Sequence, residues 1–314
     1  MKKLLLALLC SAMAMAAAPV MALTVSITQI VEHPSLDAAS KGFQDVLREA
    51  GLEVEFKIHV AQNNITTSQQ IVTQIIDEKP DLILAISTPS AQHVVNTVKD
   101  VPILFTAVTD PVAAQLVASL EQPGANVTGT SDMSPLAELI GIIREIQPEA
   151  KTLGTIYNSG EINSVVQIDI VKKACETYGF TLVEASTANN AGVTQAAQSL
   201  VGKVDAIFLP TDNTVISSYE TVLKVGADHN IPIYPAEADS LAKGGSATLS
   251  LDYERLGRQT GEMAVKILRD GAKPADIPVE LQKDFNLVYN GQFLEAIGQT
   301  LPQSVLDRSK EVSK

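Results

Sequence analysis

Two short stretches of this chain follow nearly the same pattern: Lys79-Pro80-Asp81-Leu82-Ile83-Leu84 and Lys203-Val204-Asp205-Ala206-Ile207-Phe208. Each places an Asp before an uninterrupted apolar run, which is typical of a strand buried on both faces in a parallel sheet. A second apolar run, marked by a proline, follows each of them at residues 101–105 and 231–235. Because the same order of features occurs twice, the sequence predicts two similar α/β lobes.

Segments with helical spacing separate the apolar runs. Gly51 and Gly271 would end the first and the last of these helices. In the third helix we expect Ser134 as the cap and Pro135 at the first helical position. The amphipathic faces occupy residues 39–50, 71–76, 136–143 and 256–268, and the expected strands are 23–27, 82–86, 103–105, 153–157, 206–209 and 231–234. Alternating strands and helices predict Rossmann-like lobes with parallel sheets.

The boundary between the lobes is placed near residues 128–133. We expect residues 23–129 and 253–274 to form lobe 1, and residues 130–252 and 275–314 to form lobe 2. Two-lobed binding folds usually cross between lobes three times. The late helix should therefore pack on the first lobe, and the tail should return to the second.

The first 22 residues have the pattern of a secretory signal peptide. A basic start at Lys2 and Lys3 precedes an uncharged apolar run that is too short for a membrane anchor, and Val20-Met21-Ala22 fits a cleavage site after Ala22. Cys10 follows a Leu rather than a small residue, so lipid attachment is not expected. The sequence predicts an exported, periplasmic protein whose remaining Cys175 packs in a core.

Composition excludes several classes of function. The 314 residues include 23 Lys and Arg against 36 Asp and Glu, a net charge of -13, which argues against nucleic-acid and polybasic membrane binding. Trp is absent, which disfavours a carbohydrate ligand. The common phosphate-binding, dinucleotide, zinc-protease and serine-hydrolase motifs are missing, and the four His have no metal-ligand spacing. We expect a binding protein rather than an enzyme, with no catalytic residue, metal or cofactor.

Polar residues follow the expected strands at the point where each strand ends. Ligands collect at the carboxyl ends of strands in open α/β sheets. Each polar residue has a second interpretation as an ordinary helix cap. The candidate ligand-binding residues are Gln29, Glu32, His33, Ser87, Thr88, Pro89, Ser90, Ala91, Ala107, Val108, Thr109, Asp110, Tyr157, Asn158, Glu161, Asp212, Asn213 and Glu237.

The candidate residues suit a zwitterionic ligand such as an α-amino acid. The capped helix start near Thr88 offers backbone N–H groups and a positive dipole end to a carboxylate, with help from residues 107–109. Asp212 would face it from lobe 2 and hold the ammonium group, with Glu237 as a weaker alternative. Asp212 also fits the simpler role of a helix cap, which leaves both interpretations open.

Four stretches resemble one protein family, the ABC-transporter substrate-binding proteins of the tryptophan/phenylalanine-binding type. They are Gln29-Ile30-Val31-Glu32-His33-Pro34-Ser35-Leu36-Asp37, Phe105-Thr106-Ala107-Val108-Thr109-Asp110-Pro111, Asp212-Asn213-Thr214-Val215 and Asp252-Tyr253-Glu254-Arg255-Leu256-Gly257-Arg258-Gln259-Thr260. The resemblance implies a type I periplasmic-binding fold with a hinge and an interlobe cleft. It also implies docking onto an ABC permease with its ATPase, and some members bind aromatic amino acids.

Two functions remain. The first is the solute-binding component of an ABC importer, with an amino acid as ligand, such as Phe, Tyr or Trp. The second is a periplasmic sensor that presents its ligand to a membrane receptor. A ligand-responsive transcription regulator would need a DNA-binding head where the signal peptide stands.

Overall fold

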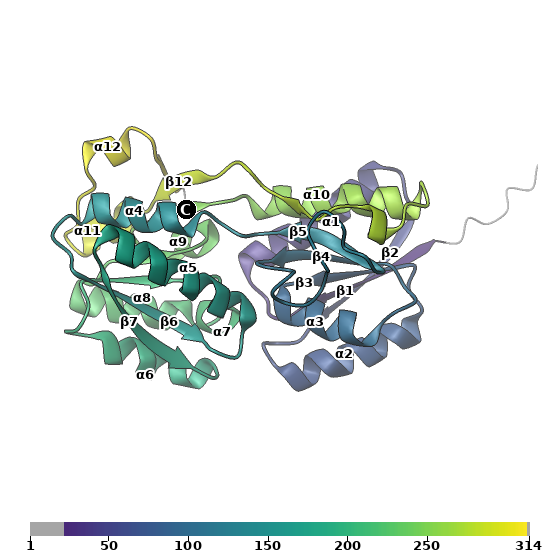
Figure 1. Ribbon diagram of the computed structural model, residues 1–314, viewed down its shortest axis with the longest axis horizontal. Coiled ribbons are helices and arrows are strands. Elements are labelled where there is room, and N and C mark those ends of the chain that lie inside the picture. Colours follow the sequence, from purple (N-terminus) through teal and green to yellow (C-terminus); the bar gives the residue numbers. More distant parts are fainter. Residues whose placement is uncertain (1–21, 313–314) are drawn as a thin grey trace, which may run out of the picture.

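The computed structural model describes residues 22–312 of the chain, and its two lobes lie side by side (Figure 1). The predicted signal sequence and Cys10 lie outside this range, apart from Ala22 at the predicted cleavage point. Both lobes contain parallel sheets and helices, as the sequence predicted. Within residues 22–312, no helix has both the length and the apolar character that crossing a membrane requires.

Lobe 1 consists of six strands and the helices that cover them. The strands are β1 (Leu23–Gln29), β2 (Val54–Val60), β3 (Leu82–Ile86), β4 (Ile103–Val108), β5 (Val127–Ser131) and β11 (Glu280–Leu281). The helices are α1 (Pro34–Glu49), α2 (Ile65–Glu78), α3 (Thr88–Thr97) and α10 (Tyr253–Leu268), with a 3-10 turn at Pro274–Asp276. The strands pair in parallel in the order β11-β5-β4-β3-β1-β2. α1 and α10 cover one face of this sheet, and α2 and α3 cover the other (Figure 1).

Lobe 2 has a four-stranded parallel sheet and a smaller mixed sheet. The strands are β6 (Thr152–Asn158), β7 (Thr181–Thr187), β8 (Ala206–Leu209), β9 (Ile233–Pro235), β10 (Ala247–Ser250), β12 (Asn286–Tyr289) and β13 (Lys310–Glu311). The helices are α4 (Leu136–Ile146), α5 (Ile162–Tyr178), α6 (Asn190–Leu200), α7 (Asn213–Ile216), α8 (Tyr219–His229), α9 (Ala238–Lys243), α11 (Gly291–Ala296) and α12 (Gln303–Leu306). The sheet orders are β7-β6-β8-β9 and β10-β12-β13. Adjacent residues of β8 point to opposite faces, so Ile207 and Phe208 belong to two separate cores.

The chain passes between the lobes after β5, after β10 and after β11. The late helix packs on α1 of lobe 1, and the tail pairs with β10 of lobe 2. The first and the third crossings come later than the expected boundaries, however. β5 extends to Ser131 within the lobe 1 sheet, and β11 pairs with β5, so the chain stays with lobe 1 beyond residue 274.

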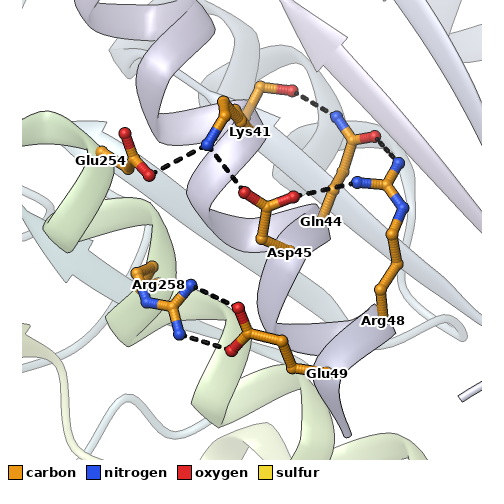
Figure 2. A network of polar contacts seen from close by, with 8 residues as sticks. Lys41, Gln44, Asp45, Arg48, Glu49, Glu254 and Arg258 are labelled. Carbon is orange, nitrogen blue, oxygen red and sulfur yellow. Dashed lines mark hydrogen bonds and ion pairs between the residues drawn. The ribbon is translucent and has the colours of Figure 1, made fainter. Parts of the chain in front are cut away.

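α1 and α10 pack so closely that their backbones nearly touch. A Cβ added at Gly42 would overlap the backbone of Glu254, and one at Gly257 would overlap that of Ala39. Charged side chains line the outer edge of this contact (Figure 2). The Nζ of Lys41 lies 3.0 Å from Glu254, and Arg258 forms two hydrogen bonds with Glu49. The two helices therefore form one unit, although more than 200 residues separate them in the sequence.

Two predictions about individual residues have different outcomes. α4 begins at Leu136 with Pro135 as its N-cap, so the expected cap at Ser134 was wrong. The reason is the backbone of Pro135, whose ψ of 68° lies outside the helical range. Cys175 is buried in the lobe 2 core beside Val171, as predicted, and burial raises the pKa of its thiol to about 11.

Candidate functional site

A cavity lies between the lobes, and its empty volume of about 450 Å³ includes space that is open to solvent. It is lined from lobe 1 by residues that follow β1, β3 and β4, and from lobe 2 by residues that follow β8 and β9. Asp132 and Tyr253 line it from two of the crossings. The cavity therefore occupies the position that the strand ends predicted.

The lobe 1 wall contains two residues with left-handed backbone conformations. Ser87 has φ 82° and Ala107 has φ 54°, and both line the cavity. The strain at Ala107 coincides with a shift in the pairing of β4 and β5 between Phe105 and Val108. Such bulges redirect the chain beside binding sites, and backbone strain of about 1–3 kcal/mol per residue is often kept there. The left-handed backbone conformations in this wall therefore lower the stability of the fold.

The start of α3 presents polar groups to the cavity. Its cap residue, Ser87, makes no side-chain capping bond, and the hydroxyl is buried without a partner. The hydrogen bonds of the helix begin with the N–H of Ala91, which donates to the carbonyl of Ser87. The N–H groups of Thr88 and Ser90 precede that first bond, so the anion-binding end of the helix consists of these two groups and excludes the N–H of Ala91.

The lobe 2 wall contains a buried carboxylate whose two oxygens are both hydrogen-bonded within the lobe. Asp212 is fully buried and caps α7 by accepting from the N–H of Val215 at 2.8 Å. Its other oxygen accepts from the N–H of Asn158 and the hydroxyl of Ser164, each at 2.6 Å. Burial, with the neighbouring Glu161 carboxylate, raises the pKa of Asp212 to about 7. Of the two interpretations of Asp212, the structure shows the cap.

Glu161 anchors the same loop. It accepts hydrogen bonds from the backbone and side chains of Asn213 and Thr214, and from the amide of Asn163. These donors come from α5 and α7, which the carboxylate holds together. Its position beside Asp212 gives this wall a negative potential.

Asp132 lies where β5 leads into the first crossing. One carboxylate oxygen accepts from the Tyr253 hydroxyl at 2.9 Å, and the other, Oδ1, is buried without a partner. Burial raises the pKa of this carboxyl above its usual value. Asp132 and Tyr253 thus join two crossings behind the cavity.

Side chains at the rim connect the lobes directly. The hydroxyl of Ser35 lies 2.8 Å from Glu237 and 2.7 Å from Asp239. The Nδ1 of His33 accepts from the N–H of Ser35, and its Nε2 lies 3.7 Å from Glu237. Burial raises the pKa of Asp239. On another side of the cleft, Asn63 donates to Asn190 at 2.7 Å. The lobes are therefore in a closed arrangement.

The structure brings some of the predicted site residues together and leaves others apart. Those that line the cavity are His33, Ser87, Thr88, Ala107, Thr109, Asp212, Asn213 and Glu237. Those that line a neighbouring groove between the lobes are Pro89, Asn158 and Glu161. Those that line neither are Gln29, Glu32, Ser90, Ala91, Val108, Asp110 and Tyr157. Several of the last group have other partners: Gln29 binds Asp37, Asp110 caps a turn, and Tyr157 donates to Glu184 on β7.

Other lining residues were not among the candidates. They are Val31, Ser35, Leu36, Asp132, Asn163, Thr211, Ile216 and Tyr253. Val31, Leu36 and Ile216 supply apolar surface. The signal for Asp132 was its place after a strand, but that strand was interpreted as a linker. Tyr253 begins a helix at an expected lobe boundary, but its place in the wall of the cavity could not be predicted from the sequence.

Two parallel α/β lobes that enclose a cavity at their strand ends define a type I periplasmic-binding protein. The chain belongs to a particular family within this class: residues 24–313 match the ABC transporter substrate binding protein family. It is 42% identical to a tyrosine-binding protein of Clostridioides difficile (strain R20291), over 87% of this chain and 80% of that protein.

Solved structures agree with this assignment. An ABC domain from Streptococcus pneumoniae in complex with L-Trp has a TM-score of 0.89 at 34% identity, covering 93% of this chain and 100% of that one. The ligand-free, open structure of a substrate binding protein with adhesive properties from Clostridium difficile has a TM-score of 0.70 at 42% identity, covering 93% and 99%. The structure with the higher identity is thus the less similar in shape.

Proposed function

We propose that this protein is the extracytoplasmic solute-binding component of an ABC importer, and that it captures an aromatic amino acid between its lobes. Membership of the substrate-binding family supports the first part. The aromatic ligand is supported by relatives described as tyrosine-binding and as bound to L-Trp. The predicted signal peptide supports export to the periplasm, and an ABC permease with its ATPase would receive the ligand.

The chemistry of the cavity carries this proposal. Among the described residues, neither Lys nor Arg lines it, whereas Asp132, Asp212 and Glu237 do. A ligand without a cationic group would meet uncompensated negative charge there. Neutral donors at the start of α3 suit a carboxylate, and Val31, Leu36 and Ile216 suit an apolar side chain. Together these features favour a zwitterion with a large apolar side chain.

The arrangement of the lobes supports ligand capture by closure. The chain has a higher TM-score to the L-Trp complex than to the open, ligand-free structure, although it is less identical to the former. The contacts of Ser35 and Asn63 across the cleft can form only when the lobes approach each other. A ligand that touches both lobes would favour this arrangement over an open one.

A thermal-shift screen of the twenty amino acids, with native mass spectrometry of the purified protein, tests the ligand class. We expect L-tyrosine, L-phenylalanine or L-tryptophan to give the largest increase in melting temperature, because binding to the native state alone stabilises it. Sugars should give none. Delivery is tested by comparing uptake of the labelled amino acid in cells with and without the gene. Unchanged uptake would contradict the importer role.

A further inference from the structure

We propose that Asp132, at the end of β5, is the residue that holds the ammonium group of the ligand. This inference rests on the proposed function, since it assumes that the ligand is an amino acid. It assigns the ammonium site to the crossing between the lobes, and not to Asp212 on the lobe 2 wall. The assignment follows from which carboxylate oxygens have hydrogen-bond partners.

Asp132 has an oxygen available in the cavity. The residue is only 6% exposed, and its Oδ2 accepts from the Tyr253 hydroxyl at 2.9 Å. Its Oδ1 is buried and has no donor in hydrogen-bond geometry among the described residues, although the Thr109 side chain lies close enough to the carboxylate to oppose the rise in its pKa. Buried carboxylate oxygens almost always have donors, because removing them from water without one is costly. A ligand N–H group in the cavity would satisfy this oxygen.

The other carboxylates of the cavity already have partners. Asp212 accepts from three groups of its own lobe, as described above. Glu237 caps α9 through the N–H of Ser240, and its two oxygens also face His33 and Ser35. Of the carboxylates that line the cavity, only Asp132 therefore has an unpartnered oxygen among the described residues.

A cation is the donor that fits this position best. Neither Lys nor Arg lines the cavity in the described part of the chain, and the imidazole of His33 lies beside Glu237, so neither balances an ionised Asp132. Burial raises the pKa of Asp132, and a bound ammonium would oppose that rise. Asn163, which lines the cavity from α5, has an unpartnered amide oxygen that can accept a second N–H. Neutral hydroxyl donors would leave the charge of Asp132 unbalanced.

Asp132→Asn tests the assignment, because it keeps the shape of the side chain and removes the charge. The probes are L-tyrosine, L-tryptophan and 3-(4-hydroxyphenyl)propanoate, which matches tyrosine but lacks the amino group. We expect calorimetry to show that Asp132→Asn weakens L-tyrosine binding by about 30- to 1000-fold. The parent should prefer L-tyrosine to the des-amino compound by a similar factor, and the variant should show little preference.

Asp252→Asn is the matched control. Asp252 adjoins Tyr253 at a crossing, is exposed, does not line the cavity, and caps α10, a role that Asn also fills. The Asp252→Asn variant loses one negative charge next to Tyr253 in the sequence, and it should bind L-tyrosine within about threefold of the parent. Melting curves without ligand show whether each variant is folded. If Asp132→Asn does not fold, Asp132→Ser is measured in its place.

The outcomes distinguish an error in the role of Asp132 from an error in the proposed function. If the parent binds L-tyrosine or L-tryptophan and folded Asp132→Asn keeps the parent's preference over the des-amino compound, the role of Asp132 is wrong while the proposed function stands. If the parent binds none of the twenty amino acids, the proposed function fails and the ammonium site fails with it. A collapse of the preference in Asp132→Asn, but not in Asp252→Asn, supports the assignment.

Discussion

The two sides of the cavity treat their polar groups differently. On the lobe 2 side, Asp212 and Glu161 accept hydrogen bonds from donors of their own lobe. On the side of lobe 1 and the first crossing, the hydroxyl of Ser87 and one oxygen of Asp132 are buried without partners. The lobe 2 acids thus stabilise their own wall, whereas Ser87 and Asp132 keep polar atoms for a ligand, as does the amide oxygen of Asn163 on lobe 2.

This difference shows that a polar residue at a strand end can have either of two roles: it can hold a loop in place or it can bind a ligand. Asp212 and Asp132 both follow strands, and both line the cavity. Only their hydrogen-bond partners distinguish a residue that holds a loop from one that can hold a ligand.

The contrast predicts unequal effects of two Ala substitutions on stability without ligand. Asp212→Ala leaves three donors unpaired, two of them buried, so we expect it to lower the free energy of unfolding by about 3–5 kcal/mol. Asp132→Ala leaves only the Tyr253 hydroxyl and also removes an unpartnered oxygen, so the loss should be about 0–2 kcal/mol. Urea denaturation measures both. Equal losses would contradict the distinction between the two sides.

The raised pKa of Asp212 predicts a pH dependence that Asp212→Asn removes. An aspartate carboxyl ordinarily has a pKa of 3.8, whereas that of Asp212 has a pKa of about 7 in the fold, so between these values only the folded state holds the proton. This proton makes its whole contribution to the stability of the folded state below about pH 4, and the contribution is lost as the pH rises toward 7. The parent should therefore lose stability relative to the variant over this range, by at most about 1.4 kcal/mol per pH unit. Urea denaturation at several pH values measures this. A constant difference in the free energy of unfolding between parent and variant over this pH range would contradict the prediction.

Closure depends on contacts between the lobes at the rim of the cavity. Ser35→Ala removes the hydroxyl that meets Glu237 and Asp239 of lobe 2. We expect L-tyrosine affinity to fall about 3- to 10-fold, the value of one net hydrogen bond. Small-angle scattering should show a smaller radius of gyration with ligand in the parent, and less compaction in the variant at the same ligand concentration. Ser199→Ala, within lobe 2, is the control and should change neither.

The smallest effect is expected at the exposed charges along α1 and α10 (Figure 2). Arg258→Ala removes the pair with Glu49, which lies in solvent and is screened by salt. L-tyrosine affinity should stay within about threefold of the parent. Any decrease in melting temperature should be slight at low salt and disappear in about 1 M sodium chloride. A large loss of binding would show that this surface communicates with the cavity.

The sequence predicted those parts of the fold whose strands are apolar throughout. β3 and β8 have the predicted bounds because both of their faces are covered. β5 was interpreted as a linker, since it contains two threonines, a glycine and a serine. Its threonines are nevertheless buried: Thr128 donates to the carbonyl of Ile277, and Thr130 bonds with Thr106 and Thr260. A strand whose buried hydroxyl groups bond to other core residues does not appear as an apolar run in the sequence, so β5 was not recognised.

The same limit explains which site residues were missed. The rule that polar residues collect at strand ends identified Ser87, Thr109 and Glu237, which follow recognised strands. Asp132 obeys that rule, but its strand was not recognised. Ser35 and Tyr253 line the cavity only because the closed lobes bring a helix start and a crossing to it. Such proximity depends on tertiary structure that local patterns do not contain.

The pairing of α1 with α10 has a consequence for how a nascent chain acquires its shape. The ribosome releases α1 long before α10, so the glycine-marked groove of α1 stays uncovered until residues 253–268 emerge. The four strands of the main lobe 2 sheet are all complete by Pro235 and can assemble earlier. The helix that is synthesised first thus waits for a partner that the ribosome releases more than 200 residues later. A chain cut after residue 252 should form lobe 2 contacts while lobe 1 remains sensitive to protease.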